Sequence, residues 1–220
     1  MSAPAGDAVL ECRGLTVQVP GRELVGALNA AIRPGRVLAL LGRNGAGKSS
    51  LLHVLAGLAA PAAGQVLFAG RPVAAWPRRD LARRLGLLMQ ASEDPFPGTV
   101  LDTALVGRHP HIDPWQWESD ADRATARQCL AAMDLAGLEA RDVGTLSGGE
   151  RRRLAIATVL AQDPQVFLLD EPIQQLDPPH QLDVLRRFRA LADAGRTVVL
   201  SLHDPGLAAR FADDALLLFG

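Results

Sequence analysis

One short stretch, GRNGAGKSS at residues 42–50, constrains the fold of this chain more than any other. It follows the apolar run VLALL and precedes SSLLHVLAGL, whose apolar residues have the spacing of an amphipathic helix. Residues 42–49 match the pattern GxxxxGK(S/T), in which glycines let backbone N–H groups surround phosphate oxygens at a helix N-terminus. The sequence therefore predicts a strand, a phosphate-binding loop and a helix in that order.

The lysine in this stretch, Lys48, is the only lysine of the chain, and the other 22 of the 23 Lys and Arg residues are arginines. A guanidinium is a broad planar fork, whereas the compact ammonium of lysine fits inside a tight loop of backbone amides. We expect Lys48 to reach the β- and γ-phosphates of a nucleotide and the Ser49 hydroxyl to bind Mg²⁺. The alternative is a glycine-rich turn that matches by chance, which the flanking strand and helix disfavour. The predicted loop residues are Gly42, Arg43, Asn44, Gly45, Ala46, Gly47, Lys48, Ser49 and Ser50.

Five short apolar runs predict strands that are buried on both faces, as in a parallel sheet covered by helices. They span residues 37–41, 85–89, 165–169, 197–202 and 215–219. Two other segments, residues 10–19 and 65–68, are bounded by Pro and Gly turns and are predicted as antiparallel strands. The alternation of apolar runs with helical stretches indicates an α/β fold.

The pattern changes in the middle of the chain. Strand signals disappear from about residue 92 to residue 160, and residues 120–135 and 150–161 have helical spacing. The length of 220 residues suits one domain, residues 1–220. Within it we expect a core with a β subdomain at residues 1–91 and 161–220, and a helical subdomain at residues 92–160.

The composition excludes several functions. Hydrophobic residues make up 48% and charged residues 21% of the chain, as in soluble globular proteins. The formal net charge of -1 gives no basic field for nucleic acid, and arginine pairs such as Arg78-Arg79 are expected on solvated helix faces. Cys12 and Cys129 form no CxxC pair, so neither a zinc site nor a disulfide framework is predicted. No window has the roughly eighteen apolar residues that a membrane span needs, so any membrane role must run through a partner.

Two further motifs indicate chemistry. Asp170 and Glu171 end the apolar run QVFLL, where the first suits Mg²⁺ and the second suits polarising the water that attacks a γ-phosphate. Residues 146–150, LSGGE, open a helix with Ser147 as the N-cap, and the exposed amides form a second anion-binding end. The alternatives are solvated acids at a strand end and an ordinary helix cap. Two anion-binding ends in one domain raise the question of what the second one binds.

Together these motifs resemble the nucleotide-binding subunit of ATP-binding cassette (ABC) transporters, over essentially the whole chain. The resemblance implies a P-loop NTPase core with a mainly parallel sheet, an antiparallel β subdomain and an inserted helical subdomain. It also implies an ATPase that uses ATP and Mg²⁺. The matching motifs are GRNGAGKS, Gln90 after LGLLM, LSGGE, VFLLDEP, Leu176-Asp177 and His203 after TVVLSL.

The resemblance further implies a head-to-tail dimer, in which each ATP lies between the phosphate loop of one copy and the LSGGE helix of the other. Ser147 and Gly149 would contact the γ-phosphate in the partner's site, Gly148 would belong to the same nucleotide-binding segment, and Asp177 would couple the two sites. The implied partners are integral membrane permease subunits and, indirectly, a periplasmic or surface binding protein. The chain would be peripheral, at the cytoplasmic face of the cell membrane. The implied catalytic residues are Lys48, Gln90, Glu171 and His203, and the implied metal-binding residues are Ser49, Gln90 and Asp170.

Within this family, the phrases TVLDTALVGRHPH and LDPPHQLDVL look like the importers of iron-siderophores, haem and cobalamin. The alternatives are another import or export motor and a soluble cassette ATPase that acts on nucleic acid or ribosomes. The soluble ATPases carry long coiled-coil insertions or two cassettes, and this sequence has neither. Residues 94–100 match the segment where such subunits meet the membrane partner. For His109 and His111 we expect a loop role, because Pro110 separates them and no third metal ligand is near.

The sequence departs from the family pattern at three places. Val19 stands where an aromatic residue normally stacks on adenine, so aliphatic contacts or an arginine, Arg13 or Arg22, are expected to replace it. We therefore expect weak discrimination between ATP and GTP. Residues 173–175, IQQ, differ from the usual ones beside the predicted coupling residue. The sequence ends at Gly220, where such importers commonly continue, so either a tail is missing or this subunit lacks one.

Overall fold

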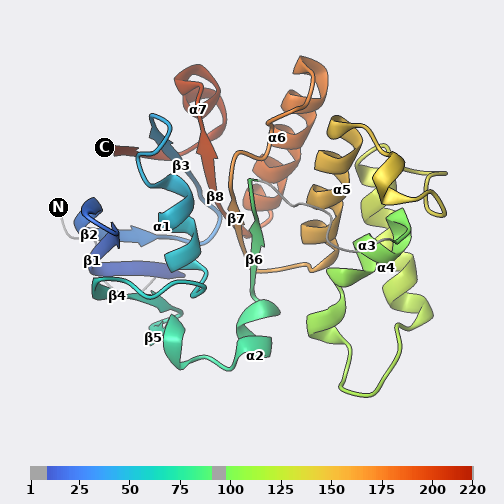
Figure 1. Ribbon diagram of the computed structural model, residues 1–220, viewed down its shortest axis with the longest axis horizontal. Coiled ribbons are helices and arrows are strands. Elements are labelled where there is room, and N and C mark those ends of the chain that lie inside the picture. Colours follow the sequence, from blue (N-terminus) through green and yellow to red (C-terminus); the bar gives the residue numbers. More distant parts are fainter. Residues whose placement is uncertain (1–8, 91–97, 220) are drawn as a thin grey trace.

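The computed structural model of the chain, which describes residues 9–90 and 98–219, contains two β-sheets with helices around them (Figure 1). The larger sheet is parallel and has the strand order β6-β7-β8-β3-β9. The smaller sheet is antiparallel and has the order β2-β1-β4-β5. The predicted α/β fold with a mainly parallel sheet is confirmed. The parallel strands are β3 (Val37–Gly42), β6 (Leu85–Leu88), β7 (Val166–Leu169), β8 (Thr197–Leu202) and β9 (Asp214–Leu218).

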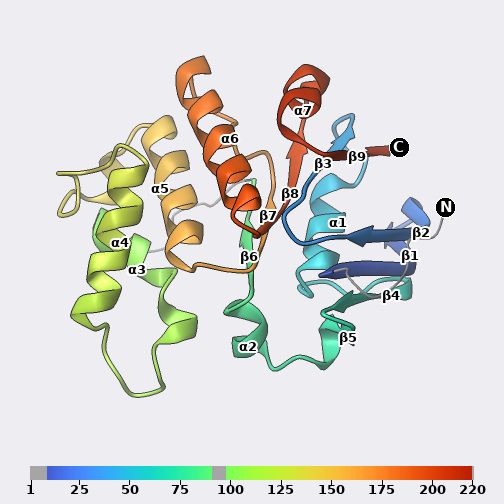
Figure 2. The same ribbon diagram turned by 180° about the vertical axis from the view of Figure 1, so that it is seen from behind.

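The parallel sheet is covered by helices on both faces. Leu40 of β3 belongs to one hydrophobic cluster together with Leu52 of α1 (Lys48–Leu55). The neighbouring Ala39 belongs to a second cluster, on the face covered by α6 (Pro178–Asp193), which Figure 2 shows from behind together with α7 (Pro205–Phe211). Because successive side chains of a strand point to opposite faces, the central strands are mostly apolar, and Thr197 and Ser201 of β8 are buried polar exceptions. Every residue of β7 and β8 is buried, as predicted.

Strand β9 differs from the prediction of strands buried on both faces. Of its five residues only Leu218 is buried, and Leu217 is 56% exposed. β9 lies at the edge of the sheet and pairs with β3. The prediction of two buried faces was wrong here, because an apolar run alone does not distinguish an edge strand from a central one.

The antiparallel sheet lies beside α1 and contains one strand that the sequence pattern does not reveal. β1 (Leu10–Val19) and β4 (Ala63–Phe68) confirm the two predicted antiparallel strands. The missed strand, β2 (Arg22–Ile32), forms a hairpin with β1, and only two of its 11 residues are buried. A strand with so few buried residues shows no period-two apolar pattern. The two-residue strand β5 (Arg71–Pro72) completes the sheet.

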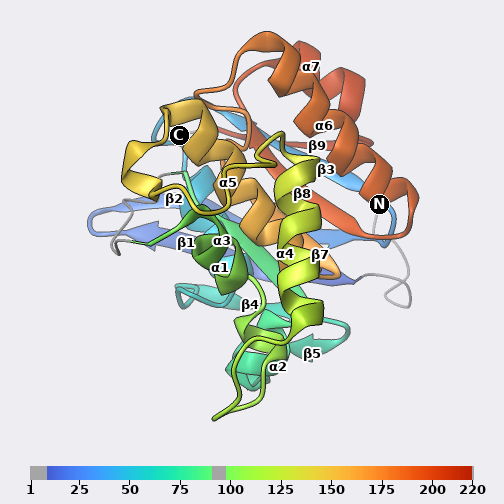
Figure 3. The same cartoon turned by 90° about the vertical axis from the view of Figure 1, so that its right-hand side faces the viewer.

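Three helices pack together beside the parallel sheet and lie between β6 and β7 in the chain: α3 (Val100–Val106), α4 (Asp120–Ala132) and α5 (Gly148–Ala161) (Figures 1 and 3). α4 and α5 correspond to the two stretches with helical spacing. Each of the three helices begins with a capping box, in which a hydroxyl and a carboxylate reciprocally accept backbone N–H groups. The pairs are Thr99 with Asp102, Ser119 with Asp122, and Ser147 with Glu150. Within the described ranges, no helix combines the length and the apolar character that crossing a membrane requires.

Side chains at the two ends of α5 hold the two ends of β6. At the start of the strand, Gln162 donates its amide N–H groups to the carbonyls of Ala82 and Leu85. At the other end, Arg152 donates to the carbonyls of Met89 and Gln90. Since the start of the helix contacts the end of the strand, α5 runs antiparallel to β6 and stays beside it along its length. The short helix α2 (Arg78–Ala82) precedes β6.

Candidate active site

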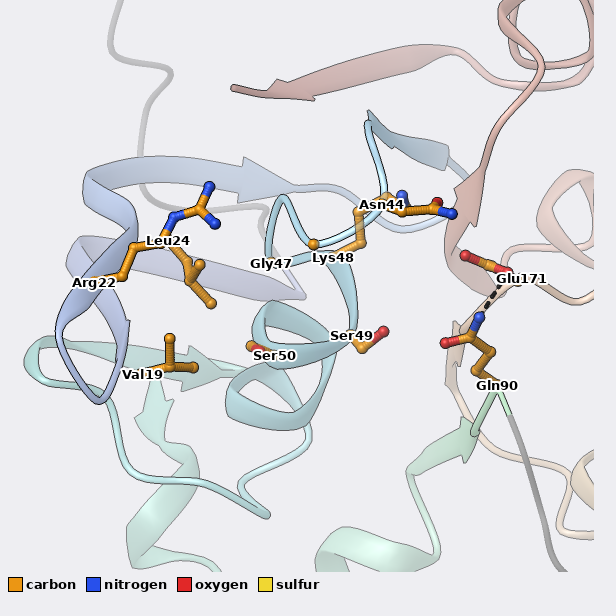
Figure 4. A pocket seen from close by; sticks show the side chains of 11 residues that line it. Val19, Arg22, Leu24, Asn44, Gly47, Lys48, Ser49, Ser50, Gln90 and Glu171 are labelled. Atoms are coloured by element: carbon orange, nitrogen blue, oxygen red, sulfur yellow. Dashed lines mark hydrogen bonds between the residues drawn. The ribbon is translucent and has the colours of Figure 1, made fainter. Parts of the chain in front are cut away.

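The C-terminal ends of four parallel strands meet at one edge of the sheet and bring predicted site residues together. β3 leads into the loop of residues 42–47, and β6 ends shortly before Gln90. β7 is followed by Asp170 and Glu171, and β8 by His203. In open α/β sheets this edge is where ligands bind. Figure 4 shows the residues that line the resulting cavity.

The backbone of the loop requires glycine at two positions. Gly45 and Gly47 have φ angles of 79° and 97°, which residues with a Cβ rarely adopt. A Cβ on Gly47 would also lie 2.8 Å from the Cβ of Leu24 in β2. Helix α1 begins at the next residue, so its N-terminus, with the positive end of its dipole, faces the loop.

The ammonium of Lys48 closes this loop. Its Nζ donates to the carbonyl oxygens of Gly42 at 2.8 Å and Arg43 at 3.3 Å, and the residue is only 5% exposed. The lysine stem therefore runs inside the turn of the backbone. A planar guanidinium would need more room there, which agrees with lysine standing at this position in a chain that otherwise uses arginine.

Both acidic residues after β7 are buried, which excludes the alternative of solvated acids at a strand end. Asp170 is 2% and Glu171 6% exposed. Ser201 of β8 joins them: its hydroxyl donates to Oδ1 of Asp170 and accepts the backbone N–H of Glu171, both at 2.7 Å. The sequence analysis missed Ser201. The signal that could have found it is a serine inside the otherwise apolar strand end VVLSL.

The carboxylate of Glu171 is held by two other predicted catalytic side chains. Nε2 of Gln90 donates to Oε2 at 3.0 Å, and Nε2 of His203 donates to Oε1 at 2.6 Å. The backbone of Glu171 has a φ of 47°, an uncommon value for a residue with a side chain, and such strain often occurs at functional sites. The structure therefore brings three of the four residues expected to be catalytic into direct contact.

A cavity of about 420 Å³ connects the phosphate loop with this cluster (Figure 4). Its volume is within the range of small-molecule sites. On one side lie loop residues, including Lys48 and Ser49, with Gln90 and Glu171 beyond them; on the other side lies the β1–β2 hairpin. No aromatic residue is among the described residues that line it. The lining residues are Val19, Arg22, Leu24, Asn44, Gly45, Gly47, Lys48, Ser49, Ser50, Gln90 and Glu171.

Only one of the two arginines predicted near the base lines this cavity. Arg13 instead forms an ion pair with Glu11, with 2.8 Å between Nε and Oε1. Arg22 lines the cavity together with Val19 and is exposed, and its guanidinium has no hydrogen-bond or ion-pair partner within residues 9–90 and 98–219. The described structure therefore favours Arg22 over Arg13 as a contact for the base.

The LSGGE segment lies apart from this cavity in the same chain (Figure 1). Ser147 caps α5, and its hydroxyl accepts the backbone N–H of Glu150 at 3.2 Å. Gly148 and Gly149 lie against Gln175: a Cβ on Gly148 would be 3.4 Å from its Oε1, and one on Gly149 3.4 Å from its backbone oxygen. The predicted second anion-binding end therefore does not line the cavity of the phosphate loop within a single copy.

Asp177 also lies outside the cavity, at the start of α6. Its carboxylate caps the helix by accepting the backbone N–H of His180 at 3.1 Å, and it accepts a second hydrogen bond from the His180 ring. These two hydrogen bonds, the one from the backbone first, lower the pKa of Asp177. Asp170 is also absent from the cavity lining, and its Oδ1 faces Ser201.

The two histidines expected in a loop, His109 and His111, form a short 3-10 helix. Nε2 of His111 donates to the carbonyl oxygen of Gln162 at 2.8 Å and so ties this segment to the C-terminal end of α5. Across the described residues there is no group of three or more His, Cys, Asp and Glu side chains that could hold a metal ion. Of the segment predicted to meet a membrane partner, residues 94–97 lie outside the described residues, and Thr99 caps α3.

A phosphate-binding loop at the end of a parallel strand, with a buried carboxylate across the cavity from it, defines a P-loop nucleoside triphosphatase. A family profile described as ABC transporter matches residues 25–174. The chain belongs to the ABC transporter family, as the subunit that binds and hydrolyses ATP.

Known relatives agree with this assignment. The hemin import ATP-binding protein HmuV of Pseudomonas entomophila is 43% identical over 215 residues, which cover 96% of this chain and 83% of that protein. The cobalamin import ATP-binding protein BtuD of Halobacterium salinarum is 40% identical over 210 residues, 95% of this chain but 52% of that protein. A solved structure described as an inward-facing transporter of the metal-chelate type matches with a TM-score of 0.82 at 32% identity, covering 96% of this chain and 79% of that one.

Proposed function

We propose that this ATPase powers the import of haem, cobalamin or an iron-siderophore. The substrate class is supported by the two relatives above, which are named for hemin and cobalamin import and match over at least 95% of this chain. One observation carries the catalytic part of the proposal. Glu171, which lines the same cavity as the phosphate loop, has its carboxylate held by Gln90 and His203.

The residues of the cavity fit a nucleotide with Mg²⁺. Lys48 has three N–H donors and gives two to loop carbonyls, so the third remains for a β- or γ-phosphate oxygen. The Ser49 hydroxyl and the Gln90 side-chain oxygen are oxygen ligands of the kind Mg²⁺ prefers, and Asp170 would act through a water. When bound, Mg²⁺ neutralises phosphate charge.

Glu171 is proposed as the general base. Its carboxylate accepts a proton from the water that attacks the γ-phosphorus, while the bond from that phosphorus to the β,γ-bridging oxygen breaks and ADP leaves. Gln90 and His203 each donate one N–H to this carboxylate. An ionised carboxylate has about four lone-pair positions, so acceptor positions remain for the water. The two donors therefore fix the orientation of the base without blocking it.

We propose that two copies pack head to tail around two nucleotides. The support is that Ser147, Gly148 and Gly149 form a helix N-terminus suited to an anion but lie apart from the cavity of their own chain. In the dimer this helix end would complete the partner's site, and Asp177 would connect the two sites. The copies would dock on integral membrane permease subunits at the cytoplasmic face of the membrane, with a binding protein acting only through the permease.

The base of the nucleotide is proposed to lie between the hairpin and α1. Val19 and Leu24 offer aliphatic contact, and Arg22 offers a planar guanidinium. These three side chains carry no ring to stack on adenine and no acceptor for its amino group. Weak discrimination between ATP and GTP remains our prediction.

The role of Glu171 is tested by Glu171→Gln, with Glu118→Gln as the control. We expect Glu171→Gln to keep ATP binding and to hydrolyse at least about a hundredfold more slowly, because general-base catalysis contributes roughly 10²–10⁴-fold. With ATP it should accumulate as a dimer in size-exclusion chromatography with light scattering. Glu118 is half-buried in an ion pair with Arg123 and does not line the cavity, so its variant should behave as wild type in hydrolysis. Unchanged turnover in Glu171→Gln would remove the proposed role.

The shared sites are tested by mixing two inactive variants, Lys48→Ala and Gly149→Asp. In a head-to-tail dimer, each mixed pair has one site with both halves intact. An equal mixture should therefore regain up to about a quarter of the wild-type activity, since half of the dimers are mixed. No recovery, or full wild-type activity of the unmutated chain at dilutions where it is monomeric, would contradict the dimer.

A further inference from the structure

Arg152 is a buried charged residue with no role in the proposed reaction so far described. It is 6% exposed, whereas its neighbour Arg151 is exposed and Arg153 is half-buried. Its guanidinium donates five hydrogen bonds, all to backbone carbonyl oxygens. Nε donates to Pro172 at 3.2 Å, Nη1 to Met89 at 2.7 Å and Gln90 at 3.3 Å, and Nη2 to Asp170 at 2.5 Å and Glu171 at 2.6 Å.

These bonds use every N–H of the guanidinium. Arginine has five N–H donors in a rigid planar fork, one on Nε and two on each terminal nitrogen. No carboxylate of the described residues forms an ion pair with Arg152, so carbonyl dipoles compensate its buried charge. Burial lowers the pKa of Arg152, and the charges of Asp170 and Glu171 oppose that effect. A lysine, with three donors on one nitrogen, cannot satisfy the same five oxygens.

The five oxygens belong to the two segments that carry the candidate active site. Met89 and Gln90 follow β6, and residues 170–172 follow β7. The side chains of Gln90 and Glu171, which extend from these segments, are hydrogen-bonded to each other. One side chain of α5 therefore holds the backbone on both sides of this contact.

The conformation of Glu171 depends most strongly on the hydrogen bonds from Arg152. Its backbone is in the left-handed region, with a φ of 47°. Its N–H donates to Ser201, and its carbonyl accepts from Arg152. The strained residue is thus fixed on both sides by buried side chains, which sets the direction of its carboxylate.

Arg152 also lies in the first turns of α5, directly after the LSGGE segment. A helix transmits displacement of its first turn because its backbone hydrogen bonds hold it as a unit. Any movement of Ser147 or Gly149 against a partner is therefore passed to the carbonyls that Arg152 holds.

We propose that Arg152 is a positioning residue for ATP hydrolysis, which couples the start of α5 to the backbone carrying Gln90 and Glu171. The inference rests on the proposed function, because it assigns Arg152 an effect on the base Glu171. Arg152 holds the backbone of Gln90 and Glu171 but does not itself line the cavity, so its effect is exerted through Glu171.

The test compares Arg152→Lys with Arg153→Lys in the full chain. Arg153 is on the same helix, but its Nη1 donates to the carbonyls of Met133 and Asp134 on the side of α4, away from the site. We expect Arg152→Lys to lower kcat by about 10–100-fold, since small misplacements of catalytic groups have effects of that order. Its KM for ATP should stay within about threefold of wild type, because the phosphate loop is untouched. Arg153→Lys should change neither value by more than about twofold.

A second measurement separates positioning from general structural damage. Arg152→Lys is combined with Glu171→Gln, and single-turnover hydrolysis is measured, with rates normalised to the fraction of chain that binds a fluorescent ATP analogue. If Arg152 acts through Glu171, the lysine substitution should slow the Glu171→Gln chain by less than about threefold, because effects of coupled residues are not additive. Arg152→Gln, which keeps a planar amide, is used in the same way if Arg152→Lys does not fold.

Three results would overturn the inference: an unchanged kcat, a raised KM at unchanged kcat, or an equal loss in the wild-type and Glu171→Gln chains. Failure of the proposed function itself looks different, because the unmutated chain would then not hydrolyse ATP or would not depend on Glu171.

Discussion

Replacing Ser201 by alanine tests how the two buried acids are held. The hydroxyl of Ser201 makes two hydrogen bonds of 2.7 Å, one to the Asp170 carboxylate and one from the Glu171 N–H. Neither Oδ1 of Asp170 nor this N–H has another partner in the described part of the chain. A buried polar group left without a partner costs about 1–3 kcal/mol, and more if it is charged.

From these two lost bonds we expect Ser201→Ala to lower the free energy of unfolding by about 3–5 kcal/mol. Removing one oxygen leaves a gap too small for a water molecule, so solvent cannot replace the hydroxyl. We also expect slower ATP hydrolysis, because the carboxylate of Asp170 and the backbone of Glu171 lose the atom that joins them.

The assay is equilibrium urea unfolding, with the midpoint and the slope of the transition compared at pH 7. Thr197→Val is the matched control: Thr197 is in the same strand and equally buried, but its hydroxyl makes only one long hydrogen bond, 3.4 Å to the carbonyl of Arg33. It should lose at most about 1 kcal/mol. If Ser201→Ala were no more destabilised than Thr197→Val, the bridging role of Ser201 would be refuted.

Three further predictions concern the base, a thiol and a helix cap. The dissociation constants of ATP and GTP should agree within about tenfold in a fluorescence titration. Arg22→Ala should weaken the binding of GTP more than that of ATP, because a guanidinium can donate to both O6 and N7 of guanine. Arg13→Ala is the control, and equal losses of affinity for both nucleotides in Arg22→Ala would contradict the contact. Burial raises the pKa of Cys12 to about 12, so at pH 8 only about one Cys12 thiol in ten thousand is ionised. An aromatic disulfide reagent should therefore label Cys129 before Cys12 in the native chain, and rapid labelling of Cys12 would contradict its burial. Hydrogen bonds from Ser119 and then Arg108 lower the pKa of Asp122. The wild-type chain should therefore be more stable than Asp122→Asn by a full amount above about pH 4, and this difference should disappear as the pH falls through the lowered pKa. If the urea midpoints of the two chains differed equally at pH 7 and in strong acid, the charge of Asp122 would not be responsible.

The parts of the fold that the sequence predicted have strong, local signals. The phosphate loop combines glycine at positive φ angles with a flanking strand and helix, and each of these is visible within about twenty residues. Strands β7 and β8 are buried on both faces, so their sequences are almost entirely apolar. Glu171, Gln90 and His203 come from different strands, yet a parallel sheet places the ends of its strands at one edge.

The parts that were missed depend on contacts between distant residues. β2 is largely exposed, and only its hairpin with β1 defines it. Arg152 is one of three consecutive arginines, and nothing in the sequence distinguishes it from Arg151 and Arg153. Its burial follows from the packing of α5 against the ends of β6 and β7, which helical periodicity alone does not specify.

The pairing of α5 with β6 has a mechanical consequence. Gln162 and Arg152 bind the helix to both ends of the strand by hydrogen bonds, so the helix braces one of the two edge strands of the parallel sheet. If the three helices move relative to the sheet during ATP hydrolysis, β6 must either move with them or lose these hydrogen bonds. β6 would then move with the helices rather than with the sheet to which it is hydrogen-bonded. The backbone amides of β6 and α5 would consequently show hydrogen exchange at similar rates.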